Sequence, residues 1–161
     1  MKKMPKTNAM RQLDSQKIDY CVHEYPHHGQ EAVDGNEVAQ LLGIDPACVF
    51  KTLVTRSHTH EILVYMIPVN TKLDLKKCAK AAQVKSTEMV PVKEIQSLTG
   101  YIRGGCSPLG MKKKYRTFID QSALKQNHIV FSGGKIGIQI EMDPRALIDV
   151  FHVAPFDLVF D

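Results

Sequence analysis

Hydrophobic and polar residues alternate along several short segments of the chain, which is the pattern of half-buried β-strands. Between residues 18 and 25, Ile18, Tyr20 and Val22 alternate with other side chains. The segments 49–55 and 61–69 are rich in β-branched residues and flank a polar tip, so they predict an antiparallel hairpin with a longer loop. Related patterns predict further strands at residues 84–87, 116–120, 128–132 and 137–142.

Short helices are predicted between these strands from capping residues and helix breakers. Asp34, Asp74 and Asp143 each precede an apolar-periodic segment, as N-caps do, and Gly43 ends the first of these helices. The helical segments are expected at residues 9–16, 34–43, 75–83 and 91–98, after Asp45-Pro46 and from residue 143 onward. Short strands mixed with short helices, without regular βαβ spacing, favour an α+β fold over a doubly wound sheet.

Length and composition narrow the class of protein. The chain has 161 residues, 43% of them hydrophobic and 24% charged, and it contains no repeat or linker, so we expect one domain over residues 1–161. The longest apolar run, residues 62–69, is much shorter than the about 20 residues of a membrane helix. Residues 4–8 contain no apolar core of a signal peptide. We therefore expect a cytoplasmic protein that does not contact membranes.

Charge and cysteine content add little specific chemistry. A net charge of +4 permits an anionic partner such as RNA, but it equally fits a protein with a slightly basic surface. No Cys-x-x-Cys pair is present, which disfavours a zinc ribbon or thioredoxin-like chemistry, and we predict neither a metal nor a cofactor. Free thiols are expected in a reducing compartment. The four cysteines are Cys21, Cys48, Cys78 and Cys106.

Lys51 is the first candidate for chemistry. It lies in the predicted strand 49–55, and alternation places it on one face with Leu53 while Thr52 points to the other. Both faces are otherwise mostly apolar, so this segment predicts an inner strand. A lysine there either extends past the strand end to solvent or serves as a pocket cation for an anionic or carbonyl-bearing substrate. The pattern alone leaves both open.

The second candidate is the segment 100–110, which holds four glycines and a proline. A backbone of this kind can turn several N–H groups toward one anion or oxyanion, and it can equally form an ordinary structural turn. It does not match the P-loop pattern. Cys106 lies within it, but no histidine or aspartate nearby in sequence is marked as its partner, so we interpret Cys106 as a packing residue rather than a nucleophile.

Weaker features surround these two candidates. The histidines at positions 23–28 and 58–60 are interpreted as solvated loop residues rather than metal ligands. Lysines 112–114 directly follow the glycine-rich segment, where they form a solvated face or hold a phosphate backbone. The segment 133–135, Gly-Gly-Lys, is interpreted as a hairpin turn between two strands.

Several segments taken together resemble the YbaK/EbsC family. These proteins are free-standing aminoacyl-tRNA deacylases, among them Cys-tRNA(Pro) deacylases, and are related to the inserted editing domain of bacterial prolyl-tRNA synthetase. The resemblance runs from about residue 7 to the end of the chain. The Phe-Lys-Thr-Leu strand followed about 50 residues later by a Gly-x-x-x-Pro loop is specific as a combination. The segments that carry it are 49–53, 73–77, 100–113 and 132–135.

The resemblance implies a fold, a reaction and a site. The fold is a curled, mixed, largely antiparallel and barrel-like sheet wrapped by helices. The reaction is hydrolysis of the ester that joins misattached cysteine to tRNA(Pro), in which the substrate's own thiol attacks the carbonyl, beside prolyl-tRNA synthetase as a transient partner. Lys51 matches the essential lysine of the family. The substrate-binding positions implied by it are Tyr25, Thr52, Gly104, Gly105, Cys106, Ser107 and Pro108, and Gln139 is added as a pocket candidate because it alternates away from Ile138 and Ile140.

Two positions depart from the family pattern. Asp34 stands where relatives have an aromatic pocket residue, and Gln139 stands where an acidic residue is frequent. Both changes bear on which amino acid is accepted rather than on the reaction. The alternatives are therefore a deacylase for Ala-tRNA(Pro) or a broader set of aminoacyl-tRNAs, and a non-catalytic module that binds tRNA or a synthetase.

Overall fold

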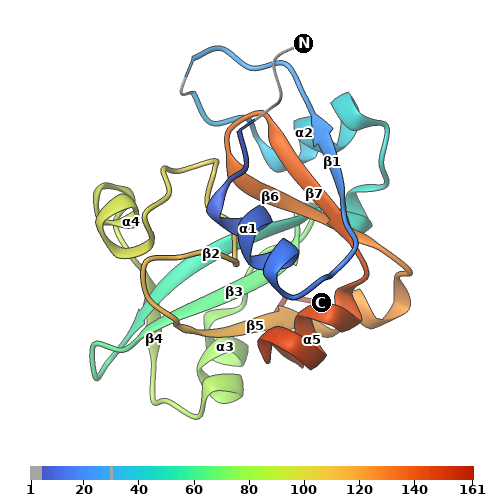
Figure 1. Ribbon diagram of the computed structural model, residues 1–161. Coiled ribbons are helices and arrows are strands. Elements are labelled where there is room, and N and C mark those ends of the chain that lie inside the picture. The colour runs from blue at the N-terminus through green and yellow to red at the C-terminus, as the bar shows by residue number, and fades with distance from the viewer. Residues whose placement is uncertain (1–4, 30) are drawn as a thin grey trace.

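The computed structural model describes residues 5–29 and 31–161, which form two β-sheets with helices around them (Figure 1). The smaller sheet has the strand order β1-β7-β6 and the larger has the order β4-β2-β3-β5-β8. The smaller sheet consists of β1 (Cys21–Glu24), β7 (Ile138–Met142) and β6 (Ile129–Lys135). The larger consists of β4 (Thr87–Met89), β2 (Phe50–Ser57), β3 (Ile62–Pro68), β5 (Arg116–Asp120) and β8 (Ala154–Phe156).

Strand directions are mixed, as expected. Four of the six strand pairings are antiparallel, whereas β5 pairs in parallel with β3 on one side and with β8 on the other. The expectation of an α+β fold is confirmed. The prediction that the sheet closes into a barrel-like shape was wrong. In the described residues, a parallel bridge between Val49 and Val130 connects the two sheets, but no continuous ladder of strand pairing closes them into a barrel.

The helices are all short and most begin at a predicted cap. The side chain of Asp74 accepts the backbone N–H groups of Lys76 and Lys77, and that of Asp143 accepts the N–H of Arg145. These bonds satisfy backbone donors that a helix start leaves without intrahelical partners. The helices are α1 (Asn8–Ser15), α2 (Gly35–Leu42), α3 (Leu75–Ala82), α4 (Val92–Thr99) and α5 (Pro144–Phe151), with 3-10 turns at Pro46–Cys48 and Gln121–Lys125.

Three details differ from the prediction. The strand expected at 84–87 lies instead at Thr87–Met89, and β8 was not predicted. The segment 133–135 is not a turn but the end of β6, where the register with β7 shifts between Ser132 and Lys135. Such a bulge adds residues to one strand and increases its bend, and here it carries Gly134 at a φ of 103°, a conformation that glycine adopts without a side-chain clash. The turn itself follows at residues 136–137.

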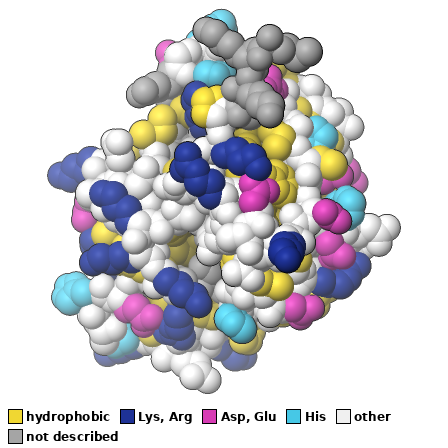
Figure 2. Space-filling model, viewed as in Figure 1, with side chains coloured by type: hydrophobic (Ala, Val, Ile, Leu, Met, Phe, Trp, Pro, Cys, Tyr) yellow, Lys and Arg dark blue, Asp and Glu magenta, His cyan; other side chains and the backbone are white. Residues whose placement is uncertain are grey.

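Lys and Arg side chains are spread unevenly over the surface. Figure 2 shows many of them on the side of this face where α4 lies in Figure 1, with several Asp and Glu side chains toward the opposite side. A basic region of this kind favours an anionic partner. Among residues 5–29 and 31–161, no helix combines the length and the apolar character needed to cross a membrane.

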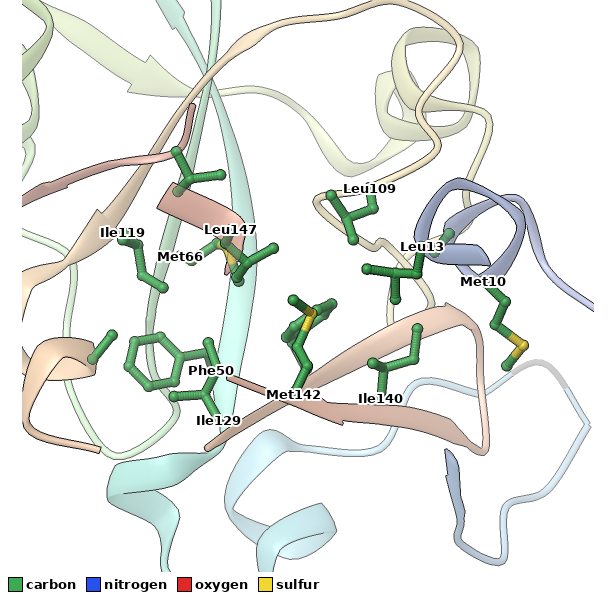
Figure 3. Packing of buried hydrophobic residues seen from close by; sticks show 14 of the residues in the cluster. Met10, Leu13, Phe50, Met66, Leu109, Ile119, Ile129, Ile140, Met142 and Leu147 are labelled. Atoms are coloured by element: carbon green, nitrogen blue, oxygen red, sulfur yellow. The ribbon is translucent and has the colours of Figure 1, made fainter. Parts of the chain in front are cut away.

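The main hydrophobic core lies between the two sheets (Figure 3). Phe50 and Met66 from the larger sheet pack in one cluster with Phe131 and Ile140 from the smaller, and Leu13 of α1 joins them. A second cluster, which includes Tyr65, lies on the other face of the larger sheet and contains residues of α3. The larger sheet is therefore buried on both faces, which keeps β2 and the residues along it in a fixed position.

Candidate active site

A cavity of about 510 Å³ lies along β2. Its wall includes six consecutive residues, Val49–Val54, which is unusual because alternate residues of a strand normally face opposite sides. The remaining wall comes from the segment after β1, the start of α2, the β4–α4 region, the loop 100–110 and the facing side of β6 and β7. We refer to this space as the β2 cavity.

The β2 cavity exists because one edge of β2 pairs with different parts of the chain at its two ends. At the start of the strand, Val49 forms a bridge to Val130 of the smaller sheet, whereas further along Thr55 is opposite Met89 of β4. Between these two pairings, no strand of the described residues pairs with this edge of β2, and we call this stretch the open edge. The carbonyl of Val54 accepts the N–H of Val90 on this side at 3.1 Å, and the alternation of a strand then directs the backbone N–H and C=O of Thr52 toward the gap.

Lys51 lies in this open stretch. Its side chain is half-buried and lines the β2 cavity, and no ion pair within 4.0 Å involves it among the described residues. Of the two interpretations left open by the sequence, this placement favours a pocket cation. A cation on a partly desolvated wall interacts more strongly with a bound anion or carbonyl oxygen than it would in water.

Thr52 and Gln139 add polar atoms that have no partner. Both residues line the β2 cavity, and the side-chain oxygens Thr52 Oγ1 and Gln139 Oε1 are buried without a hydrogen bond from the described residues. Gln139 is only 6% exposed and lies in β7 opposite His23 of β1 and Ser132 of β6. Most buried polar atoms are satisfied in folded proteins, so two unsatisfied ones on a single cavity wall indicate a polar ligand.

Tyr25 and the segment after it form another part of the wall. The side chain of Tyr25 is buried and lines the cavity, and its backbone N–H donates to the carbonyl of Gly137 at 2.9 Å, which continues the β1–β7 pairing by one residue. Asp34 lines the cavity from the N-terminal end of α2. The structure thus places Lys51, Thr52, Tyr25 and Gln139 together, although they come from three different strands or strand ends.

The glycine-rich loop is divided between two environments. Gly104 and Cys106 line the β2 cavity. Gly104 has a φ of 86°, and a Cβ there would lie 2.8 Å from the Cβ of Ala32, so a larger residue would be strained and would push against the opposite wall. Gly105 instead packs against the backbone of the β6–β7 turn, where a Cβ would be 3.1 Å from the nitrogen of Ile136.

Ser107 and Pro108 do not line the β2 cavity. Ser107 is completely buried and its Oγ accepts the N–H of Leu109 at 3.3 Å, which is a structural role within the loop. Pro108 lines a separate cavity of about 260 Å³ on the side of α1 and α5. Lys113 and Lys114 line this second cavity rather than the first.

The thiol of Cys106 is a poor candidate for a nucleophile. The residue is 8% exposed, and burial raises the pKa of its thiol to about 11. Only a small fraction of such a thiol is ionised at neutral pH, and the thiolate is the reactive form. Cys78 is also buried, Cys48 is half-buried and Cys21 is exposed, and all four cysteines are free. Cys78 and Cys106 thus lie in hydrophobic clusters, and the interpretation of Cys106 as a packing residue agrees with its place in the fold.

Several wall residues were not predicted from the sequence. Arg103 brings a second cation to the cavity, and Ser132 contributes a hydroxyl beside Gln139. Arg103 could have been predicted as a wall residue, because it lies within the glycine-rich loop that the sequence already marked as a candidate site. Met89 and Val92 are apolar residues without such a signal, and only the folded structure brings them to the cavity. Among the residues that the structure describes, no group of three or more His, Cys, Asp or Glu side chains is arranged to hold a metal ion.

Comparison with known proteins places this site in a family. The sequence pattern of the aminoacyl-tRNA editing domain matches residues 30–150. The chain belongs to this family. An Enterococcus faecalis (strain ATCC 700802 / V583) protein, EbsC, is 42% identical over 149 residues, which cover 92% of this chain and 90% of the relative. EbsC is described as a candidate Cys-tRNA(Pro)/Cys-tRNA(Cys) deacylase.

Solved structures of the same fold extend this comparison. The hypothetical protein APE2540 matches with a TM-score of 0.87 and 19% identity over 96% of this chain and all of that one. A candidate trans-editing enzyme for prolyl-tRNA synthetase matches with a TM-score of 0.81 and 20% identity over 98% of this chain and all of that one. The resemblance to the YbaK/EbsC family is confirmed. The reaction class that it implied, deacylation of an aminoacyl-tRNA, is confirmed as well.

Proposed function

We propose that the β2 cavity receives the aminoacylated 3′ end of a tRNA and that the protein removes cysteine from Cys-tRNA(Pro). The observation that carries this proposal is the open edge of β2, where Lys51 lines the same cavity as two side-chain oxygens, of Thr52 and Gln139, that have no hydrogen-bond partner among the described residues. An aminoacyl ester offers an ammonium, a carbonyl and ribose hydroxyls to such a wall. The name given to EbsC, at 42% identity, supports cysteine as the aminoacyl group.

The proposed mechanism uses the thiol of the substrate. The thiol loses its proton as its sulfur forms a bond to the carbonyl carbon of its own ester, the bond from that carbon to the ribose oxygen breaks, and the ribose oxygen takes up the proton that the thiol released. The cyclic thioester left on cysteine is then opened by water. Because the nucleophile arrives with the substrate, the protein has to supply orientation rather than a thiol of its own. The buried, un-ionised Cys106 is consistent with this division of roles.

Lys51 is proposed as the catalytic cation. Negative charge develops on the carbonyl oxygen when the sulfur attacks, and a fixed cation or N–H group stabilises that charge most effectively in a water-poor site. The backbone of Thr52, directed to the same gap, offers an N–H group for this purpose. Gln139, Thr52 Oγ1 and Gly104 are proposed to hold the terminal ribose, Tyr25 to form the wall behind it, and Cys106 to shape the wall by packing.

Gly105, Ser107 and Pro108 are proposed to act indirectly. They hold the loop in position through packing and the Ser107–Leu109 hydrogen bond, so Gly104 stays at the cavity. We also propose that tRNA identity is read by prolyl-tRNA synthetase in a transient complex, and that the whole chain is one domain acting in the cytoplasm. The two tRNAs in the name of EbsC support weak tRNA selectivity in this family.

The test is a deacylation assay with labelled Cys-tRNA(Pro), Ala-tRNA(Pro) and Pro-tRNA(Pro), with and without prolyl-tRNA synthetase. Preferential release of cysteine supports the proposal. Equal release of alanine would replace it with a broader deacylase, since alanine has no thiol and requires a different nucleophile. Release of none of the three, together with salt-dependent tRNA binding, would indicate a non-catalytic module. The proposed partner is tested by adding prolyl-tRNA synthetase, which should increase the selectivity of the protein for tRNA(Pro).

A further inference from the structure

The wall of the β2 cavity includes a carboxylate to which the proposed mechanism gives no role. Three charged residues line it: Lys51, Arg103 and Asp34. Asp34 is the single carboxylate of this lining, and no ion pair within 4.0 Å involves any of the three in the described part of the chain. The carboxylate is therefore available to a ligand.

Asp34 also lacks the role that its position would normally give it. It is the N-cap residue of α2, yet its side chain makes no capping hydrogen bond. By contrast, the aspartates before α3 and α5 each accept backbone N–H groups of their helix. Aspartate is favoured at a helix start because it can form such a bond. At Asp34 the bond is not made, so this exposed carboxylate on the cavity wall is free to bind another group.

The fold holds Asp34 in this place. The next residue, Gly35, lies so close to Val69 that a Cβ there would be 2.4 Å from its Cγ1 atom, so the start of α2 is pressed against the end of the β2–β3 hairpin. Val69 in turn donates its N–H to the carbonyl of Val49, the cavity residue directly before β2. The carboxylate is thus attached to the same rigid frame as Lys51.

The charges of an aminoacylated 3′ end match this arrangement. Such an end carries phosphate groups, a carbonyl that becomes negative during attack, and one cation, the α-ammonium next to that carbonyl. Lys51 and Arg103 suit the negative groups, and only Asp34 suits the ammonium. We propose that Asp34 binds the α-ammonium of the aminoacyl group, so that the enzyme requires a free amine and spares N-acylated aminoacyl-tRNA. This inference rests on the proposed function of the same cavity.

The test compares Cys-tRNA(Pro) with N-acetyl-Cys-tRNA(Pro) at about pH 6.5, where an α-amino group is mostly protonated. The wild-type protein is expected to cleave the free amine about tenfold or more faster, in kcat/KM. Asp34→Asn should lower kcat/KM about tenfold for the free amine, mainly through KM, and leave the acetylated substrate unchanged. Asp34→Glu should restore part of the loss, because it restores the charge.

The matched control is Glu37→Gln, since Glu37 is an exposed acid in the first turn of the same helix but does not line the cavity. It should leave the ratio of the two substrates unchanged. If Asp34→Asn slows both substrates by the same factor, or slows neither, the role of Asp34 is wrong while the deacylase proposal stands. If the wild-type protein cleaves neither substrate, the proposed function itself fails.

Discussion

Thr52 and Gln139 belong to different sheets, yet each places at the same cavity a buried side-chain oxygen that has no hydrogen-bond partner in the described part of the chain. Thr52 is in β2 of the larger sheet, and Gln139 is in β7 of the smaller. Leaving a buried oxygen without a partner costs on the order of 1–3 kcal/mol of stability. Such a cost at two positions facing one space is a feature of binding sites, where the partner arrives with the ligand.

The first prediction follows from this cost. Thr52→Val replaces the hydroxyl with a methyl group of similar shape, so it removes an unsatisfied group without opening a cavity. We expect the melting temperature to stay the same or rise, while kcat/KM for Cys-tRNA(Pro) falls about tenfold, which corresponds to about 1.4 kcal/mol. Thermal unfolding and single-turnover deacylation measure the two effects. Lower stability with unchanged activity would mean that Thr52 has a purely structural role.

Lys51 gives the second prediction. Lys51→Ala should lower the rate of deacylation about 100-fold or more, because loss of one group that stabilises an oxyanion typically has an effect of that size. Lys125→Ala is the matched control, since Lys125 is exposed and lines neither cavity. Its rate should stay within about twofold of the wild-type rate at moderate salt. Similar losses in both variants would point to general electrostatic attraction of tRNA instead of a role in the reaction.

Cys106 gives the third prediction, in two measurements. Cys106→Ala should keep kcat/KM within about threefold, because a thiol with a pKa of about 11 is almost entirely un-ionised at neutral pH. Iodoacetamide at neutral pH should modify the exposed Cys21 in the folded protein and reach Cys106 only after unfolding in urea. A variant that folds but has lost all activity, or rapid alkylation of Cys106 in the native state, would make this cysteine a nucleophile.

The helices and strands that could be predicted from the sequence are those whose formation depends on residues close together in the chain. The strand 116–120 was predicted with its observed bounds, and the helices after Asp74 and Asp143 begin as predicted, because caps and alternation are read from neighbouring residues. In contrast, β8 has three residues, one of them Pro155, and it exists because it pairs with β5. No local pattern marks a strand that depends on a distant partner.

The candidate site was likewise predictable from the sequence only in part. Alternation put Lys51 and Thr52 on opposite faces of an inner strand, yet both line one cavity. The reason is that, within residues 5–29 and 31–161, no strand pairs with one edge of β2 between the pairings at Val49 and Thr55. Those two pairings involve residues far away in sequence. The family resemblance supplied the grouping that local reasoning could not. It also included Pro108, which the structure places at another cavity.

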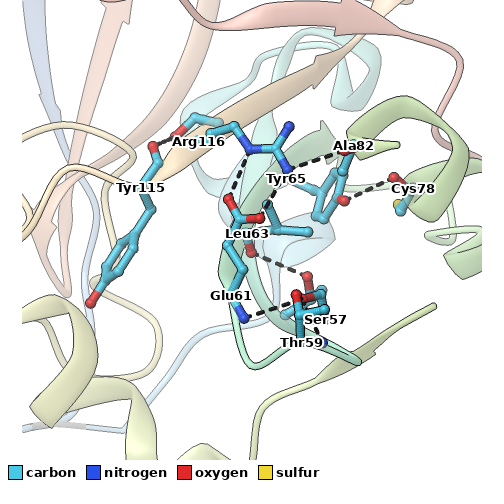
Figure 4. A network of polar contacts seen from close by, with 11 residues as sticks. Ser57, Thr59, Glu61, Leu63, Tyr65, Cys78, Ala82, Tyr115 and Arg116 are labelled. Atoms are coloured by element: carbon cyan, nitrogen blue, oxygen red, sulfur yellow. Dashed lines mark hydrogen bonds and ion pairs between the residues drawn. The ribbon is translucent and has the colours of Figure 1, made fainter. Parts of the chain in front are cut away.

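The remaining prediction concerns stability and lies away from the cavity. At the far end of the hairpin, the carboxylate of Glu61 accepts two hydrogen bonds from Arg116, at 2.8 and 3.0 Å (Figure 4). Arg116 also donates to the carbonyl of Ala82 and lies over the ring of Phe118. Arg116 therefore connects β3, β5 and the end of α3. Its hydrogen bonds lower the pKa of Glu61 below the ordinary value.

A lowered pKa in the folded state means that Glu61 stabilises the protein above its unfolded pKa of about 4.3, and that this contribution disappears as the pH falls through the lowered folded value. Both side chains are more than one third exposed, so the gain is expected to be small, about 0.5 kcal/mol. Glu61→Gln should lower the unfolding free energy by about this amount at pH 7 and by almost nothing at about pH 2.5. Urea unfolding at both pH values measures the difference, with Glu24→Gln, an exposed acid on β1, as the control. An equal loss for Glu61→Gln at both pH values would mean that the carboxylate charge is not what stabilises this junction.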